Sequence, residues 1–171
     1  MDTQSAPASD KNFFAGNFQS PQFWPVSGSS GTSVHFKPAR TTLSSLSSPN
    51  STVSLTHTFN TTGWSNISMR LQASQSASLF SSGDFLKIEV NDGSGWQRLL
   101  TDAGYFQGLD DATPESSTPV TGNTTPAWTD WIALPIGAGT HHSVQIRITC
   151  QLGSGGEQYF LNQFLLVGKK A

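Results

Sequence analysis

The segment GDFLKIEVNDGSGWQRLL, residues 83–100, sets the pattern from which the fold of this chain can be inferred. Its first half alternates an apolar row of side chains with a mixed row, namely Leu86, Ile88 and Val90 against Phe85, Lys87 and Glu89. A period of two places the two rows on opposite faces of a strand. Residues 91–95, NDGSG, favour the positive φ angles and local hydrogen bonds of a tight turn, and an extended pattern resumes at Trp96. The segment therefore predicts a β-hairpin.

Short segments of similar character predict further strands along the chain. They are residues 13–18, 34–36, 53–59, 67–73, 128–134, 144–150 and 159–167. We expect residues 27–33 to form a Gly/Ser loop and the Ser/Thr/Pro-rich residues 39–51 to form a connection that crosses the sandwich. Eight or nine strands with no helix and no internal repeat indicate an all-β fold, a two-sheet antiparallel β-sandwich of the jelly-roll type. A closed barrel is the alternative.

These strands also define the domain organisation. We expect residues 1–12 to be a flexible leader, residues 13–168 to form a single β-sandwich domain and residues 169–171 to be a solvated tail. Residues 102–126 show no usable periodicity. Loops of more than about 12 to 15 residues are uncommon and are often functional, so this loop is the first place to look for a binding site.

The composition narrows the classes of function. Charged residues make up 12% of the chain, and Ser and Thr together make up about a quarter, which is typical of an extracellular all-β domain. A net charge of −2 without a run of Lys or Arg disfavours nucleic acid as a partner. No apolar run reaches the roughly 20 residues of a membrane span, and the N-terminus has no signal-peptide pattern. Cys150, the lone cysteine, lies on an apolar strand row and is expected to be a buried, inert thiol.

Four segments taken together resemble one kind of domain. They are residues 53–75, 82–100, 127–135 and 143–168. They resemble the MAM-like and carbohydrate-binding-module-like jelly-roll domains of secreted enzymes and cell-surface adhesins. The resemblance implies carbohydrate binding, a lectin-like or adhesive role and an extracellular or cell-surface location. In some such domains an acidic residue of the last strand helps to hold Ca²⁺, and this chain has Asn162 and Gln163 there.

The acidic residues and histidines give only a weak metal hypothesis. Zinc needs three or four converging nitrogen or sulfur ligands, which four scattered histidines and one cysteine do not predict. The long loop contains Asp110 and Asp111, whose hard oxygens suit Ca²⁺ together with backbone carbonyls. The alternative is a solvated acidic loop. Calcium is thus the one cofactor that we consider, with Asp110 and Asp111 as its ligands.

No catalytic motif is evident. There is no G-x-S-x-G elbow for a nucleophilic serine. A glycosidase needs two carboxylates rising from a rigid cleft, whereas most acids here lie in predicted loops and Glu89 lies on the polar face of a strand. We therefore expect the protein not to be an enzyme.

Aromatic residues provide the best binding hypothesis, since flat rings beside polar groups suit the apolar faces and hydroxyls of sugars. We expect Trp96 and Trp131 to lie in the core and Trp24 to cover an open end of it. Tyr105, in the long loop, is available for either binding or core packing. We predict a non-catalytic glycan-binding domain whose ligand contacts Tyr105, Asp110, Asp111 and Trp128, with the turn at residues 91–95 beside them.

A different class of function remains as the alternative. Strands with Ser/Thr faces can pair edge to edge or face to face, as in a structural or adhesive protein that assembles as a homo-oligomer, such as a coat, tail or capsid component. A binding domain should be monomeric and an assembly protein should not, so light scattering distinguishes the two.

Overall fold

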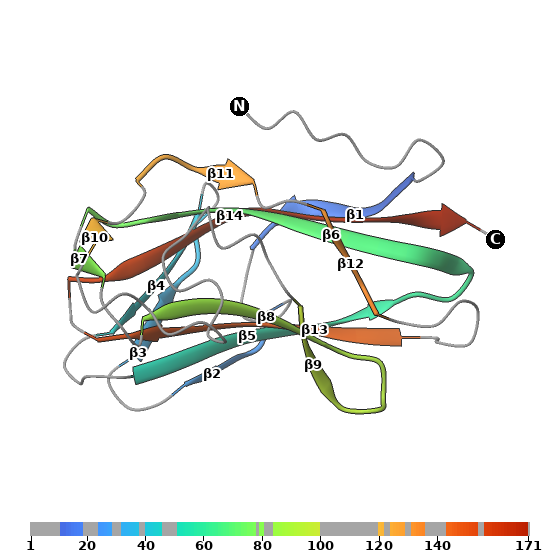
Figure 1. Cartoon of the computed structure of the whole chain (residues 1–171), viewed down its shortest axis with the longest axis horizontal. Coiled ribbons are helices and arrows are strands. Elements are labelled where there is room, and N and C mark those ends of the chain that lie inside the picture. The colour runs from blue at the N-terminus through green and yellow to red at the C-terminus, as the bar shows by residue number, and fades with distance from the viewer. Residues whose placement is uncertain are drawn as a thin grey trace.

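The computed structural model shows a β-sandwich. It describes residues 11–18, 24–28, 32–37, 40–45, 51–77, 79–80, 84–99, 120–121, 124–128, 131–135, 143–153 and 156–170. These residues form strands, turns and extended segments, and none of them lies in a helix. All strand pairs are antiparallel, and the strands form two layers (Figure 1). The all-β, two-sheet antiparallel sandwich predicted from the sequence is confirmed.

One layer is a seven-stranded sheet. Its strands are β1 (Lys11–Asn17), β3 (Thr32–His35), β4 (Thr41–Ser45), β6 (Trp64–Gln75), β11 (Ala127–Trp128), β12 (Ile132–Ala133) and β14 (Gln158–Lys170). The main path runs β11-β6-β14-β4-β3, while β1 pairs with β14 and β12 pairs with β6. The long strands β6 and β14 therefore form the centre of this sheet.

The other layer is a five-stranded sheet with the order β2-β5-β13-β8-β9. Its strands are β2 (Val26–Gly28), β5 (Ser51–Asn60), β8 (Phe85–Asn91), β9 (Trp96–Leu99) and β13 (Ser143–Leu152). The predicted hairpin is the β8–β9 pair at one edge of this sheet. A separate two-stranded ladder joins β7 (Leu79–Phe80) to β10 (Val120–Thr121). Among the described residues, no helix has the length and hydropathy that crossing a membrane requires.

The core lies between the two sheets and consists of the inward rows of the alternating strands. On β13, Val144, Ile146, Ile148 and Cys150 are fully buried, as the alternation predicts. An aromatic cluster fills one end, where the Trp24 ring lies 4.9 Å from Phe18 and 5.5 Å from Phe164, between ring centroids. Trp24 has no exposed surface, so its side chain is part of the core.

Three expectations, two about connections and one about a strand, need correction. Residues 39–51 do not all form a connection, because Thr41–Ser45 is strand β4 between β14 and β3, with Leu43 buried. The expected Gly/Ser loop at 27–33 begins within β2 and ends within β3. Residues 128–134 contain parts of two short strands, β11 and β12, rather than one. In each case pairing with a neighbouring strand decides the local structure. Segments of so few residues show little hydrophobic alternation in the sequence from which a strand could be predicted.

The strands also extend past the predicted edges of the domain. Strand β1 begins at Lys11, and β14 continues to Lys170, which pairs with Trp64 of β6. Residues 1–10 of the expected leader and Ala171 lie outside the described residues.

Candidate functional site

The residues predicted to contact a ligand fall into two groups. Tyr105, Asp110 and Asp111 lie outside the described residues, so their roles as ligand contacts or Ca²⁺ ligands stay predictions. Trp128 is described. It lies on β11, opposite Gln72 of β6, at the edge of the seven-stranded sheet.

Trp128 is engaged by an arginine of its own sheet. The guanidinium carbon of Arg70, on β6, lies 4.4 Å from the ring centroid of Trp128 and 4.6 Å from that of Trp131. Both rings are half-buried, so the expectation that Trp131 belongs to the core is wrong. Burial lowers the pKa of Arg70, but a guanidinium remains charged at neutral pH. The contact fixes β11 and the residue before β12 against β6.

A more extensive polar surface covers the outer face of the five-stranded sheet. On β5, β13 and β8 the rows that alternate with the core carry hydroxyl, amide and charged side chains. We call this surface the outer face. Its members are Ser27, Thr52, Ser54, Thr56, Thr58, Phe85, Lys87, Glu89, Asn91, Trp96, Arg98, Gln145, Arg147, Thr149 and Gln151, which pair in register with one another across the strands.

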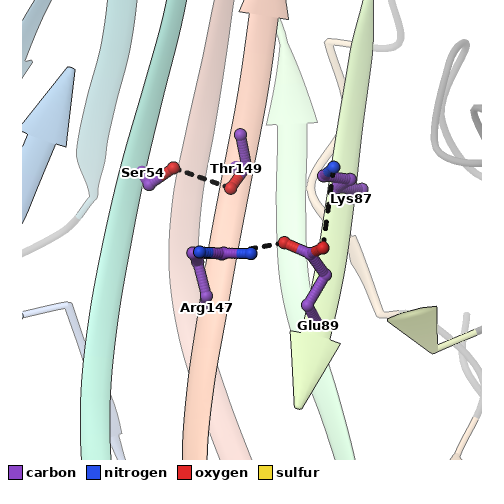
Figure 2. A network of polar contacts seen from close by, with 5 residues as sticks. All are labelled: Ser54, Lys87, Glu89, Arg147 and Thr149. Carbon is purple, nitrogen blue, oxygen red and sulfur yellow. Dashed lines mark hydrogen bonds and ion pairs between the residues drawn. The ribbon is translucent and has the colours of Figure 1, made fainter. Parts of the chain in front are cut away.

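Glu89 is the centre of the charged part of this face. Nε of Arg147 donates a hydrogen bond of 2.8 Å to Oε2 of Glu89, and Nζ of Lys87 lies 3.6 Å from Oε1 (Figure 2). The register places Glu89 directly opposite Arg147 on β13 and opposite Arg98 on β9. One carboxylate is thus flanked by a cation on each neighbouring strand and by a third on its own strand.

Arg147 also stacks on an aromatic ring. Its guanidinium carbon lies 3.9 Å from the ring centroid of Trp96, the first residue of β9. Trp96 is half-buried on the outer face, so the expectation that it belongs to the core is wrong. The physical reason is register. Trp96 pairs with Asn91, and Asn91 lies on the same face as Lys87 and Glu89.

The turn beside Trp96 has the structure that its sequence predicts. Oδ1 of Asn91 accepts hydrogen bonds from the backbone N–H groups of Gly93 and Gly95, at 2.8 and 3.1 Å. Both glycines have positive φ angles, 103° and 123°, which disfavour a side chain. The hydrogen-bonded turn therefore fixes the start of β9, and with it Trp96, relative to the end of β8.

Hydroxyl and amide groups occupy the neighbouring strands. The hydroxyls of Ser54 and Thr149 share a hydrogen bond of 2.7 Å across β5 and β13 (Figure 2). Nε2 of Gln145 donates a longer one, 3.5 Å, to Oγ1 of Thr58. Hydroxyl and amide groups can each donate and accept hydrogen bonds. The face therefore combines neutral polar groups, an oriented charged cluster and an aromatic ring.

Two buried carboxylates lie elsewhere, near the start of β8 and the start of β14. Asp84 and Glu157 are 1% and 5% exposed, and Oε2 of Glu157 accepts a 2.7 Å hydrogen bond from the backbone N–H of Gly153. Carboxylate oxygens suit Ca²⁺. Within the described ranges, however, no three or more His, Cys, Asp or Glu side chains gather closely enough to hold a metal ion.

Sequence reasoning missed the residues that the outer face brings together. The sequence signal that could have indicated these residues was the polar row of each alternating strand. Lys87 and Glu89 belong to one such row, and Arg147 belongs to another. That pattern indicates exposure but carries no information about which strands are neighbours. The pairing of β13 with β8 is what places Arg147 beside Glu89.

Comparison with known proteins gives similarity to solved structures only. No protein-family model matches the chain, and no curated protein matches it in sequence. The structure is similar to that of TmCBM61 in complex with β-1,4-galactotriose, at 16% identity and a TM-score of 0.45, over 84% of this chain and 86% of the other. It is also similar to a family 29 carbohydrate-binding module, at 15% identity and a TM-score of 0.45, over 95% and 89% of the two chains. A mutant of a family 29 module complexed with cellulohexaose gives 14% identity and a TM-score of 0.47, over 95% and 92%. Likeness of this degree does not identify a ligand or a binding residue in this chain, and the MAM-like resemblance stays a prediction.

Proposed function

We propose that this protein is a non-catalytic glycan-binding domain whose ligand lies along the outer face of the five-stranded sheet. The observation that carries the proposal is the Trp96 ring with Arg147 stacked upon it, because Glu89 holds that arginine in place beside rows of hydroxyl and amide groups.

The chemistry of this face suits sugars. The guanidinium of Arg147 lies over the half-buried Trp96 ring, and an aromatic ring beside polar groups suits the apolar C–H surface of a pyranose. Side chains that are already oriented by hydrogen bonds lose little conformational entropy when a ligand binds. Arg147, held by Glu89, and Thr149, held by Ser54, are oriented in this way.

The dimensions of the face fit an extended chain better than a single sugar. Phe85 and Asn91 begin and end β8, and Trp96 lies opposite Asn91. A strand rises about 3.3 Å per residue, so the two aromatic residues lie roughly 20 Å apart along the face. That length spans several monosaccharide units. Lys87 and Glu89 lie between the two rings and would contact the middle of such a chain.

The carboxylates support a non-catalytic role. Hydrolysis of a glycosidic bond needs two carboxyl groups on either side of the scissile bond. Among the described residues of the outer face, Glu89 is the only carboxylate, and it is engaged with Arg147 and Lys87. We therefore propose binding without hydrolysis, in a protein that acts outside the cell or at its surface.

The edges of the five-stranded sheet do not favour the assembly alternative. Its edge strands β2 and β9 contain three and four residues. Short edge strands offer few backbone groups to a second chain and are a common way to prevent edge-to-edge pairing. Homo-oligomeric assembly thus remains the alternative, but the face rather than the edge is the surface that we propose for recognition.

The long loop remains part of the proposal through its sequence alone. Tyr105, Asp110 and Asp111 are proposed to extend the site, with Ca²⁺ at the two aspartates as the proposed cofactor. Trp128 lies on the other sheet, so a ligand contact there would constitute a second, separate site.

A glycan array on the full chain, followed by titration of the best hit, tests the proposal. We expect Trp96→Ala to abolish measurable binding and Trp128→Ala, a matched substitution on the other sheet, to leave it unchanged. Loss of binding in Trp128→Ala alone would move the site to the seven-stranded sheet. A blank array with a homo-oligomer in light scattering would refute glycan binding and favour assembly. Repeating the array with a chelator tests for calcium.

A further inference from the structure

We propose that Asn60 is a site of N-linked glycosylation in the secretory pathway of a eukaryotic cell, and that a glycan there limits access to the Trp96 end of the outer face. The acceptor site is argued from the β5–β6 connection and stands without a ligand. The control of access rests on the proposed function, because it concerns the same surface.

The structure separates two matches to the N-x-S/T pattern of an N-glycan acceptor, Asn60-Thr61-Thr62 and Asn66-Ile67-Ser68. A pattern this short recurs by chance in a chain rich in Ser and Thr, so the surroundings of each match decide its value. Asn60 and Thr62, which supply the amide and the hydroxyl, are both exposed where β5 ends. Asn66 is also exposed, but Ser68 is 9% exposed within β6. Asn60 therefore belongs to the more accessible acceptor of the two.

The folded turn is compatible with a glycan on Asn60. Oδ1 of Asn60 accepts a 3.0 Å hydrogen bond from the backbone N–H of Thr62. An N-glycan is attached to Nδ2, so its attachment preserves this hydrogen bond. The backbone N–H of Trp64 then donates a 3.0 Å hydrogen bond to the carbonyl of Thr61, across Gly63, whose φ is +80°. The chain can thus carry the glycan at this turn without rearrangement.

The covalent step transfers an oligosaccharide from a lipid-linked diphosphate donor. The anomeric carbon of the first sugar forms a bond to Nδ2 of Asn60 while its bond to the diphosphate oxygen breaks. Nδ2 loses one of its two protons, and the lipid diphosphate is the leaving group. A transferase of the secretory pathway catalyses this step, so the protein itself supplies only the acceptor.

Asn60 lies at the same end of the five-stranded sheet as Trp96. It is the last residue of β5 and belongs to the same outward row as Thr58. In the register of the sheet, Thr58 shares a row with Gln145, Asn91 and Trp96. Two residues along the strands and three strand spacings across β5-β13-β8-β9 separate Asn60 from Trp96. These spacings place the two backbones roughly 16 Å apart.

A glycan on Asn60 therefore competes with a ligand for the space above this end of the face. N-glycans are bulky and hydrophilic, and their chains of sugars are long enough to cover this separation. A ligand that stacks on Trp96 loses part of its space when the glycan is present. We expect glycosylation of Asn60 to weaken binding on the outer face without changing the fold.

Asn66 provides a matched comparison on the other sheet. It belongs to the outward row of β6, since its neighbours Ile67 and Met69 point into the core. A glycan on Asn66 projects from the seven-stranded sheet, away from the outer face. Its φ of +50° is tolerated by Asn and Asp, so Asn66→Asp removes this acceptor and suits the backbone.

The first experiment measures occupancy. The full chain, fused to a cleavable signal peptide, is secreted from mammalian cells that make oligomannose N-glycans. Peptide N-glycosidase in heavy-oxygen water then converts each occupied asparagine to a labelled aspartate, which peptide mass spectrometry locates. We expect Asn60 to be occupied and Thr62→Ala to abolish its label. An unmodified Asn60 in the secreted, folded protein would overturn the inference.

The second experiment measures access to the face with the best hit of the glycan array as the probe. We expect secreted Thr62→Ala to bind it about tenfold more tightly than the secreted wild type. An endoglycosidase that leaves a single sugar on each asparagine should raise the affinity of the wild type to the same value. Secreted Asn66→Asp should bind like the wild type. When both are made in bacteria, without glycans, Thr62→Ala and the wild type should bind equally.

The outcomes separate this inference from the proposed function. An occupied Asn60 with equal affinities for the secreted wild type and Thr62→Ala would overturn the control of access and leave glycan binding intact. Equal gains in affinity from Thr62→Ala and Asn66→Asp would also overturn it, because the effect would not depend on the place of the glycan. A blank array for the bacterial protein would count against the proposed function, whereas the peptide map would still decide whether Asn60 is an acceptor.

Discussion

Glu89 and Arg147 face each other across the β8–β13 strand pair, joined by a 2.8 Å hydrogen bond from Nε of the arginine to Oε2 of the glutamate. The same guanidinium lies 3.9 Å from the Trp96 ring centroid. The carboxylate thus positions the arginine, and the arginine covers the indole. This arrangement links the charged and aromatic parts of the outer face.

The Glu89–Arg147 pair should couple energetically. In a double-mutant cycle with Glu89→Gln and Arg147→Met, we expect a coupling free energy of about 1 kcal/mol, at the upper end for partly exposed pairs because the geometry is good. Urea denaturation of the four proteins measures it. Raising the salt concentration should reduce it. The Ser54→Ala and Thr149→Val cycle is a neutral control whose coupling should not depend on salt. A Glu89–Arg147 coupling that is equally insensitive to salt would contradict the charged interaction.

Truncation of Trp24 should destabilise the protein far more than truncation of Trp96. Trp24 has no exposed surface and packs among Phe18, Phe59 and Phe164. We expect Trp24→Ala to lower the free energy of unfolding by about 3–5 kcal/mol, since it removes a large side chain from the core. Trp96→Ala, on the outer face, should lower it by about 1 kcal/mol through loss of the cation–π contact. Chemical denaturation measures both, and equal losses would show that Trp96 also supports the core.

Removal of the Arg70 guanidinium should affect the two tryptophans that it contacts. Arg70→Met keeps an apolar stem but removes the cation–π contacts to Trp128 and Trp131. We expect a loss of about 1 kcal/mol in unfolding free energy and a change in tryptophan fluorescence. Arg40→Met is the control, since Arg40 contacts the Phe160 ring and its substitution should leave the tryptophan emission unchanged. Identical spectra for Arg70→Met and the wild type would refute the contact.

Cys150 should react with thiol reagents only when the protein unfolds. Its side chain is fully buried between Val53 and Leu86 of the neighbouring strands, and burial raises the pKa of the thiol. Because the folded pKa is raised, the stability that the neutral thiol contributes is present below the unfolded pKa of about 8.5 and is lost as the pH rises above it. We expect the wild type to lose more stability than Cys150→Ala between about pH 8 and pH 10.

Labelling rates and alkaline denaturation curves check this prediction. The labelling rate in increasing urea should follow global unfolding. The thiolate is the reactive form, and the apolar folded core disfavours the thiolate. Rapid labelling of the native protein at neutral pH would contradict the buried position of Cys150. Equal pH dependence of stability in the wild type and Cys150→Ala would show that other groups govern the alkaline loss.

The alternation of side chains was sufficient to predict the main strands. Val53, Leu55 and Phe59 on β5 are buried, as are Ile146, Ile148 and Cys150 on β13, and each row was predicted from a period of two. The β8–β9 turn was predictable because Asn91, Gly93 and Gly95 are residues that adopt its backbone conformation. Strand β4 was not predictable in this way, since Thr41–Ser45 has one apolar residue and is ordered by pairing with β3 and β14.

On the regular strands β5, β8 and β13, the sequence by itself determined which apolar side chains point toward the core, because alternation depends only on neighbours along the chain. It could not determine which outward-facing side chains meet. Arg98, Glu89 and Arg147 come from three strands, and only the order β13-β8-β9 and its register bring them into one row. Arg70 likewise meets Trp128 and Trp131 only because β11 and β12 pair with β6. Strand order and register depend on the burial of the whole core, so the tertiary structure alone decided where the charges and rings of the outer face converge.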